Sequence, residues 1–366
     1  MRRVAKAVAA LLVVVAVAVE ITAVVLGLWN RAQLKAIVAL AITERTPVVA
    51  ALVRLVTDQP RSEEAVIAGR PTSIFRPGSG HGPWPAIVFV NGATRAGRFH
   101  PKVRRLAQGL ARAGFVVAVP DLPGLRLGQI TPGTTQALVR VASAFGRGRQ
   151  VSFYGVSVGA TLALLATESR ALAGRVRAVG GEAPWADLER VIRLATTGFY
   201  GSVRYHIDPY VQLAIARSLA AGLPRGGDRA RLLAVLDAEP DDDPRPLLPL
   251  RGLTRPESLI ALLLNRDPSR FAALYMRLPA RVRAGVAALS PLRRAGRIDV
   301  PVELASAPHD KYFPPEESRS LARRSPRVKV TITSTLVHAV PSPSLHDLGA
   351  LLAFDKFVVR FLRDAR

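Results

Sequence analysis

One serine in this chain lies between two glycines, in the stretch Gly155-Val-Ser157-Val-Gly159. An apolar, β-favouring run from Val151 to Tyr154 precedes the stretch, and a run with helical character from Ala160 to Thr167 follows it. This order predicts a strand, a sharp turn and a helix, and the glycines allow backbone segments to approach where a Cβ would clash. A serine held exposed beside a helix N-terminus is a candidate nucleophile, although the same five residues could form an ordinary strand-to-helix turn.

A serine hydroxyl is a weak nucleophile, so the rest of the chain must supply a histidine base and a carboxylate that orients it. The chain has six histidines and no cysteine. The lack of cysteine excludes disulfides, cysteine-ligated zinc and a cysteine nucleophile. No cluster of metal-ligating residues is visible in the sequence, so we expect neither a metal nor a cofactor.

The elements that would position such groups follow a regular pattern. Residues 64–69 and 72–75 predict an opening hairpin, after which apolar runs alternate with helical segments. The predicted strands are 85–90, 115–119, 151–154, 176–179, 300–306 and 328–333, and the predicted helices are 101–113, 134–145, 160–167, 315–323 and 344–362. Continuous apolar strands separated by helices indicate an α/β fold, with a mostly parallel sheet and helices on both faces.

Three stretches carry a resemblance to a known family: Val88-Phe-Val-Asn91-Gly92-Ala93-Thr94, Gly114-Phe-Val-Val-Ala-Val-Pro-Asp121-Leu-Pro-Gly124 and the serine turn. Together they resemble the α/β-hydrolase superfamily, over residues 85–184. The second stretch is most similar to the dienelactone-hydrolase-like and carboxylesterase-like branches. The resemblance implies the α/β-hydrolase fold and a serine esterase with a catalytic triad.

The resemblance also implies where the acid and the base lie. Asp310 follows a late strand and precedes a proline-headed helix, as the superfamily's acid does, and His338 follows the last strand, 28 residues later. We therefore predict Ser157 as nucleophile, Asp310 as acid and His338 as base. His309 and His346 are poorer candidates, and Asp121 precedes the serine, so we interpret it as a turn residue. If Asp310 is not the acid, Asp121 and Glu182 are the next candidates.

The oxyanion hole is implied in the same way. The backbone N–H groups of Val158, next after the nucleophile, and Ala93 should point at the developing oxyanion, with Thr94 as the alternative to Ala93. Many relatives have His-Gly where this chain has Asn91-Gly92. Asn91 and Thr94 are also candidates for the substrate pocket, although Asn91 could equally be a turn residue.

Residues 185–297 change character, with Leu-, Ala- and Arg-rich helical segments broken by prolines and no strand alternation. Relatives often insert a helical cap over the active site at this position. Phe199, Tyr200, Tyr205 and Tyr210 could line a substrate pocket there, or could pack the core of the cap itself. We do not expect His206 to be catalytic.

The N-terminus predicts a membrane anchor. Residues 7–29 form an apolar run whose only charge is Glu20, long enough to span a bilayer, with Arg2, Arg3 and Lys6 before it. A cleaved signal peptide is the alternative, but the run resumes after Glu20. Basic residues on both sides leave the orientation open, and the free amino group tips it toward an extracytoplasmic catalytic domain.

The net charge of +24 comes mainly from arginines scattered along the chain. There is no dense basic run and no interleaving of stacking aromatics, so we expect no nucleic-acid partner. Attraction to anionic lipid is a secondary expectation.

The sequence thus predicts five regions: an anchor (1–29), a helical connector (30–60), a core in two parts (61–184 and 298–366) and a helical cap insertion (185–297). We expect hydrolysis of an ester or thioester with an apolar acyl group, from a small-molecule or lipid-like substrate. The alternatives are a peptidase, an acyltransferase or a non-catalytic membrane-anchored binding protein. The sequence does not indicate an oligomeric state.

Overall fold

The computed structural model describes residues 57–242, 244–245, 249–341 and 347–366. The predicted anchor and nearly all of the predicted connector lie outside these residues, and so does His346. Within the described part of the chain, no helix has the length and apolar character needed to cross a membrane.

An eight-stranded sheet forms the centre of the molecule, in the order β1-β2-β4-β3-β5-β6-β9-β10. Its strands are β1 (Arg61–Ile67), β2 (Arg70–Arg76), β3 (Ala86–Val90), β4 (Val116–Pro120), β5 (Val151–Val156), β6 (Val176–Glu182), β9 (Val302–Ser306) and β10 (Val328–Ile332). The first two strands run antiparallel to their neighbours, and the other strands are parallel. The expected opening hairpin and mostly parallel sheet are both present.

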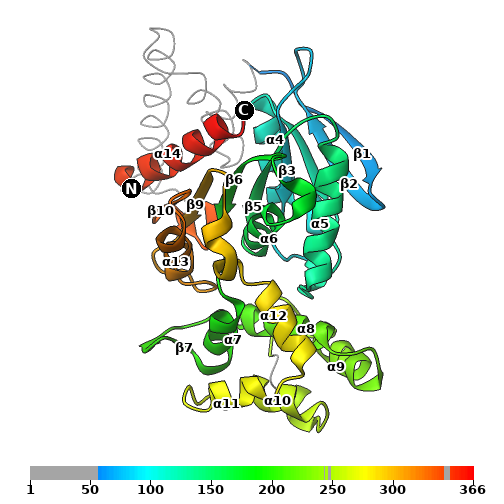
Figure 1. Cartoon of the computed structure of the whole chain (residues 1–366), viewed down its shortest axis with the longest axis vertical. Helices are drawn as coiled ribbons and strands as arrows, with labels where there is room; N and C mark the ends of the chain where they lie inside the picture. Colours follow the sequence, from blue (N-terminus) through cyan, green and yellow to red (C-terminus); the bar gives the residue numbers. More distant parts are fainter. Residues whose placement is uncertain (1–56, 243, 246–248, 342–346) are drawn as a thin grey trace, which may run out of the picture.

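Helices cover both faces of this sheet (Figure 1). In β3, Val88 and Val90 face one apolar core while Ile87 and Phe89 face the other, because successive side chains alternate across a strand. Helices α5 (Pro132–Phe145), α6 (Val158–Thr167) and α13 (Glu316–Arg324) contribute to the first core, and α4 (Pro101–Arg112) and α14 (Leu348–Asp364) to the second. Burial on both faces explains why the strands read as continuous apolar runs.

The chain between β6 and β9 forms a separate helical layer at one end of the sheet (Figure 1). It contains α7 (Leu188–Thr197), α8 (Pro209–Gly222), α9 (Gly227–Asp237), α10 (Glu257–Leu263), α11 (Phe271–Met276) and α12 (Ala280–Ala288). We call this layer the cap. It also holds a hairpin of two short strands, β7 (Phe199–Tyr200) and β8 (Val203–Arg204), which the sequence did not indicate.

Two polar clusters join the cap to the core. Buried Glu317, in α13, accepts hydrogen bonds from the backbone N–H groups of Ala186 and Asp187, both at 2.7 Å, and from the Tyr200 hydroxyl at 2.6 Å. Burial raises the pKa of the Glu317 carboxyl.

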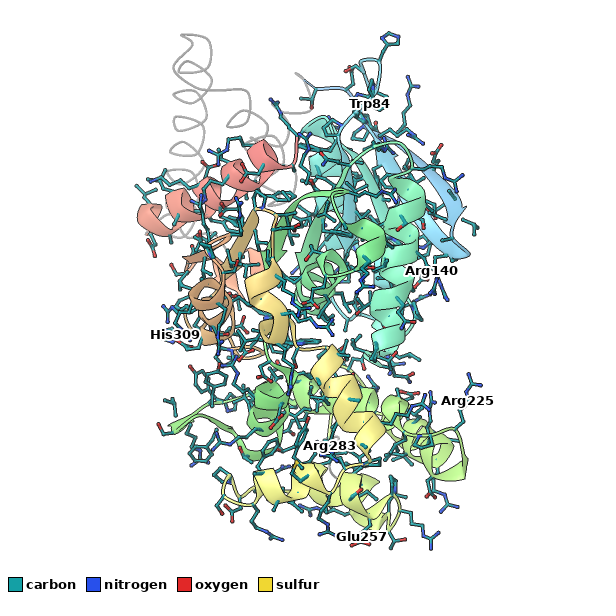
Figure 2. The ribbon with its side chains drawn as sticks, viewed as in Figure 1. Trp84, Arg140, Arg225, Glu257, Arg283 and His309 are labelled. Atoms are coloured by element: carbon teal, nitrogen blue, oxygen red, sulfur yellow. The ribbon has the colours of Figure 1, made fainter. Side chains whose placement is uncertain are left out.

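The second cluster joins the loop after β3 to α8 and to the segment after α9. Arg95, just beyond β3, donates to the Asp241 carboxylate at 3.0 Å, and fully buried Arg217 of α8 donates to the same carboxylate at 2.7 Å. The outer surface of the cap is polar, with Arg225 and Glu257 pointing away from the body (Figure 2).

The strand order, the helices on both faces and the cap between β6 and β9 together make this the α/β-hydrolase fold, as the sequence predicted. The main difference lies at the serine turn. Strand β5 continues to Val156 and helix α6 begins at Val158, so the turn is a single residue, Ser157.

Candidate active site

Ser157 occupies a strained position between β5 and α6. Its φ is 55° and its ψ is −125°, a region that residues other than glycine rarely adopt. Its backbone N–H donates to the Glu182 carbonyl at 2.7 Å, which fixes the turn to the end of β6. Such strain persists only where the surrounding structure imposes it. This backbone conformation places the Ser157 hydroxyl above the carboxyl edge of the sheet.

The two flanking glycines are required by close packing. A Cβ on Gly155 would lie 2.4 Å from the Ala160 Cα, and a Cβ on Gly159 would lie 2.0 Å from the Val90 carbonyl oxygen. Both distances are far inside van der Waals contact. The glycines therefore allow α6 to begin directly against β3 and β5, with Ser157 above the crossing.

His338 connects Ser157 to Asp310, residues that are far apart in the sequence. The distance from His338 Nε2 to Ser157 Oγ is 2.9 Å, and His338 Nδ1 lies 3.0 and 2.9 Å from the two Asp310 carboxylate oxygens. A carboxylate can only accept, so Nδ1 carries the hydrogen and Nε2 is free to accept the serine proton. The three residues predicted from the sequence are thus brought together in the order that nucleophilic catalysis needs.

The loop after β9 fixes both partners of the serine. Asp310 is buried, and its Oδ1 accepts backbone N–H groups from Tyr312 at 2.7 Å and Phe313 at 3.1 Å. The Tyr312 ring stacks on the His338 imidazole with centroids 4.2 Å apart, and the Phe313 ring meets it edge-on at 5.7 Å. The imidazole is therefore held by packing as well as by its hydrogen bonds.

The segment predicted to supply an oxyanion hole lies next to the serine. A Cβ on Gly92 would be 3.5 Å from the Ser157 Cβ, so this backbone runs against the nucleophile. The Ala93 N–H makes no hydrogen bond to the described residues, and the Val158 N–H is at the first position of α6, where no helical partner exists. The Tyr210 hydroxyl donates to the Ala93 carbonyl at 3.3 Å, and burial raises its pKa to about 12, so it remains a donor.

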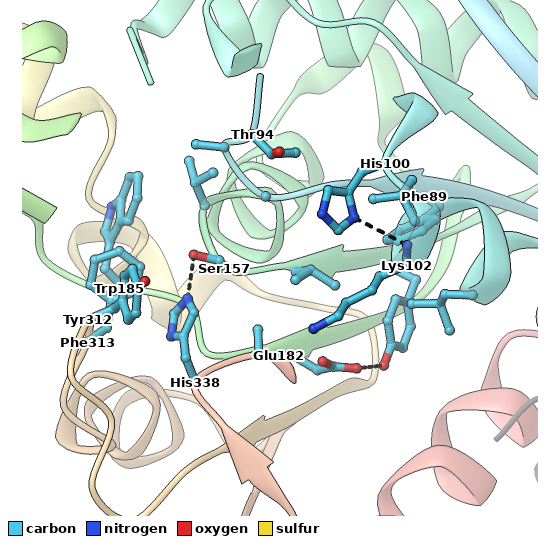
Figure 3. A pocket seen from close by; sticks show the side chains of 18 of the residues that line it. Phe89, Thr94, His100, Lys102, Ser157, Glu182, Trp185, Tyr312, Phe313 and His338 are labelled. Carbon is cyan, nitrogen blue, oxygen red and sulfur yellow. Dashed lines mark hydrogen bonds between the residues drawn. The ribbon is translucent and has the colours of Figure 1, made fainter. Parts of the chain in front are cut away.

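A cavity of about 560 Å³ opens at this point (Figure 3). Ser157, Val158, Ala93, Thr94 and His338 all line it. Most of the other lining side chains are apolar, and the cap contributes Trp185, Leu188, Tyr210, Val211, Ala214 and Ile215. A site with this lining can bury an apolar group beside the nucleophile.

Several candidates lie elsewhere. Phe199, Tyr200 and Tyr205 do not line this cavity, which corrects their tentative placement in a substrate pocket. Phe199 and Tyr200 form β7 and Tyr205 directly follows β8. Tyr200 and Tyr205 pack edge-on with centroids 6.2 Å apart, and the Tyr200 hydroxyl donates to Glu317. Asn91 is buried below the lining, and its side-chain amide donates to the Gly92 carbonyl at 2.8 Å, so it is a turn residue.

The competing titratable residues also lie away from the serine. His309 is exposed on the surface next to Asp310 (Figure 2). His81 and His206 are exposed as well. Asp121 lies 3.7 Å from the Arg126 guanidinium and does not line the cavity.

Four other lining residues were not proposed for the site from the sequence: Lys102, Arg105 and His100, from the start of α4, and Tyr312, from the acid loop. Glu182, named from the sequence as an alternative acid, also lines the cavity, at the end of β6. Its position just after a predicted strand, at the edge of the sheet where sites form, was the signal. In the described part of the chain, no group of three or more His, Asp or Glu side chains could hold a metal ion.

No family model matches the chain, and no curated protein matches it. Among solved structures, it is similar to a putative non-heme bromoperoxidase from Mycobacterium tuberculosis H37Rv, with 18% identity and a TM-score of 0.44 over 82% of this chain and 97% of that one. It is also similar to a bacterial brefeldin A esterase, with 17% identity and a TM-score of 0.47 over 84% of this chain and 77% of that one. A third similar structure is a meta-cleavage product hydrolase from Pseudomonas fluorescens IP01, with 13% identity and a TM-score of 0.45, covering 83% of this chain and 98% of that one. These similarities are distant, and the fold is assigned from the strand order and the serine turn.

Proposed function

We propose that this protein is a serine hydrolase that cleaves an ester or thioester of an apolar acyl group through an acyl-enzyme on Ser157. The observation that carries the proposal is the hydrogen-bonded series from Ser157 through His338 to Asp310 at the wall of a largely apolar cavity. The cavity favours burial of an acyl chain, at about 0.8 kcal/mol per CH₂.

The proposed reaction has two steps. Ser157 Oγ attacks the acyl carbon while His338 Nε2 takes its proton, and the N–H groups of Val158 and Ala93 hold the oxyanion. The intermediate then expels the alcohol or thiol, which receives the proton from His338. In the second step His338 deprotonates a water molecule that attacks the acyl-enzyme, and the acyl–Oγ bond breaks as His338 returns the proton to Ser157 Oγ, which releases the free acid.

The experiment combines active-site labelling with hydrolysis. A fluorophosphonate probe should label the wild-type protein at Ser157, and Ser157→Ala should abolish both the labelling and ester hydrolysis. The variant should fold normally, because Ser157 is only half buried and the loss of one hydroxyl there leaves no cavity in the core. Activity that survives in a folded Ser157→Ala protein would contradict the nucleophile assignment.

A substrate panel separates the alternatives. Acyl esters of graded chain length, matched amides and an added acyl acceptor alcohol distinguish an esterase from a peptidase and from an acyltransferase. A preference for esters with longer acyl chains is expected from the apolar lining. A folded protein that neither takes the probe nor cleaves any substrate would instead be a binding protein on this fold.

A further inference from the structure

The segment after β3 carries one half of the proposed oxyanion hole. Within the described residues, the backbone N–H groups of Ala93 and Thr94 make no hydrogen bond, and both residues line the cavity beside Ser157 (Figure 3 shows Thr94). Free donors of this kind stabilise a developing oxyanion best when they already point toward it. The segment is neither helix nor strand, so other contacts must fix the direction of these N–H groups.

Side chains hold two successive carbonyl groups of this segment. The Asn91 amide donates to the Gly92 carbonyl at 2.8 Å. The Tyr210 hydroxyl donates to the Ala93 carbonyl at 3.3 Å. Each carbonyl shares a peptide unit with the next N–H group along the chain, and in a trans peptide the two point in opposite directions. Asn91 therefore fixes the direction of the Ala93 N–H, and Tyr210 fixes that of the N–H after it.

Of these two side chains, Tyr210 is the one that comes from the cap. It lies in the first turn of α8, whereas Asn91 belongs to the segment itself. Burial raises the pKa of Tyr210 to about 12, so its hydroxyl keeps the hydrogen at neutral pH. A hydrogen bond accepted by a carbonyl also polarises the peptide unit, which makes the N–H of that unit a stronger donor. The cap thus acts on the Thr94 N–H through both its direction and its polarity.

The cap holds the same segment at a second point. Arg95, two residues after Ala93, donates to the Asp241 carboxylate at 3.0 Å. Asp241 also accepts from Arg217 of α8 at 2.7 Å, and the Arg217 side chain is fully buried. This ion-pair network ties the segment to α8, and it keeps the Tyr210 hydroxyl within reach of the carbonyl that it binds.

We propose that Tyr210 is a positioning residue of the hydrolase reaction, whose hydroxyl fixes the Ala93–Thr94 peptide so that the free N–H groups of the segment meet the oxyanion. This inference rests on the proposed ester hydrolysis and assigns the cap a part in it. The cap then does more than select substrates, because stabilisation of the transition state depends on α8 being docked against the segment after β3.

Tyr210→Phe tests this inference in the full-length protein, because it removes the hydroxyl and keeps the ring that lines the cavity. The variant should lower kcat for a cleaved ester by about tenfold and leave KM within about twofold. The loss should be smaller than the roughly 10²–10³ that follows removal of a whole oxyanion donor, because the N–H groups are still present but are held less well.

A matched pair of inhibitors reads the oxyanion hole directly. The pair is the trifluoromethyl ketone and the methyl ketone that carry the acyl chain of the preferred ester. With the trifluoromethyl ketone, Ser157 Oγ adds to the carbonyl carbon, His338 takes the hydroxyl proton, and the carbonyl oxygen becomes an oxyanion. Tyr210→Phe should raise the Ki of the trifluoromethyl ketone about tenfold and leave that of the methyl ketone within about twofold. A change in the shape of the cavity alone would raise both Ki values alike.

Tyr200→Phe is the matched control. Tyr200 is also a cap tyrosine whose hydroxyl reaches the core, where it donates to Glu317 at 2.6 Å, but it does not line the cavity. This variant removes a cap–core contact of the same chemical kind away from the oxyanion segment, so kcat and both Ki values should stay within about twofold of the wild type. Circular dichroism checks that both variants are folded.

A tenfold loss of kcat with a matching rise in the Ki of the trifluoromethyl ketone, in Tyr210→Phe alone, supports the inference. Unchanged kcat, an equal rise in both Ki values, or the same losses in Tyr200→Phe would overturn it. A loss of about 10² or more would also overturn it, because the Tyr210 hydroxyl would then donate directly to the oxyanion. If the wild-type protein cleaves no ester, the proposed function itself is wrong. Cleavage that does not depend on Tyr210 overturns only this inference.

Discussion

In the proposed reaction, the proton that leaves Ser157 needs the tautomer of His338 that carries its hydrogen on Nδ1. That tautomer is set by Asp310, whose two oxygens lie 3.0 and 2.9 Å from Nδ1 and whose Oδ1 is itself held by two backbone N–H groups. In that proposed role the Asp310 carboxylate acts by position and charge, and it need not take up the proton. The charge of Asp310 can be removed without changing the shape of the side chain, by substitution with asparagine.

We predict that Asp310→Asn lowers the turnover of a cleaved ester by about 10³–10⁴ while the fold is kept, because an amide that donates to Nδ1 favours the wrong tautomer. Steady-state kinetics and circular dichroism provide the measurement. Asp121→Asn is the control, since Asp121 also ends a strand but faces Arg126 at 3.7 Å. If the control loses activity and Asp310→Asn does not, the acid has been assigned wrongly.

Single residues differed in how far the sequence could place them. The order of Ser157, Asp310 and His338 along the chain was enough to pair them, because the family resemblance fixes which strand ends carry them. The lining residues could not be found in this way. Tyr210 lines the cavity while Tyr200 binds Glu317, and that difference depends on how the cap helices dock, which no local pattern records.

At the scale of elements, the junction of β5 and α6 depends on space rather than on propensity. Helix α6 begins against the β3 backbone, and a Cβ on Gly159 would lie 2.0 Å from the Val90 carbonyl oxygen. Neither β3 nor the start of α6 can move aside, because both are buried on all sides.

We predict that Gly159→Ala destabilises the protein by roughly 3 kcal/mol or more, or prevents folding, because a buried backbone would have to shift. Urea unfolding followed by fluorescence measures this. Gly285→Ala is the control, since a Cβ there lies in the α12 helix and reaches only ordinary contact with Pro132 at 3.9 Å. The control should be neutral or stabilising by up to about 1 kcal/mol. Equal effects at the two positions would contradict the packing account of the motif.

The elements were predicted best where burial on both faces produced long apolar runs, as in β3 and β5. Their ends were less well predicted, because the turn at Ser157 holds one residue and the apolar pattern does not mark such an end. The β7–β8 hairpin was missed for a similar reason. Each strand is two residues long, and Gly198 and Gly201, with φ of 76° and 62°, permit its turns.

At the scale of the whole molecule, the described core begins at Thr57. Arg112 of α4 donates to the Thr57 carbonyl at 2.8 Å, which ties the start of the described chain to the core. Ser157, Asp310 and His338 all lie beyond this point. Membrane attachment through residues 7–29 stays a prediction from the sequence.

We predict that a chain beginning at Thr57 is soluble without detergent and cleaves short, water-soluble esters with the efficiency of the full-length protein. It should be less efficient only on substrates dispersed in membranes, because it lacks the predicted anchor. Fractionation of the two forms with membranes, followed by both assays, tests this. Release of the full-length protein from membranes by high salt alone would leave electrostatic attraction as the means of attachment.

The cap leaves the sheet after β6 and returns at β9, and these two strands are direct neighbours in the sheet. Its first and last residues are close together, because the Leu292 N–H donates to the Ala186 carbonyl at 2.9 Å and the Trp185 indole N–H donates to the Leu289 carbonyl at 2.8 Å. Ser157, Asp310 and His338 all belong to the core. A change in the length or composition of the insertion can alter which molecules reach the serine without moving the serine, the histidine or the aspartate. Over evolutionary time, mutation in one part of the gene can therefore change which molecules reach Ser157, while the residues of the proposed catalytic site are encoded in the other parts.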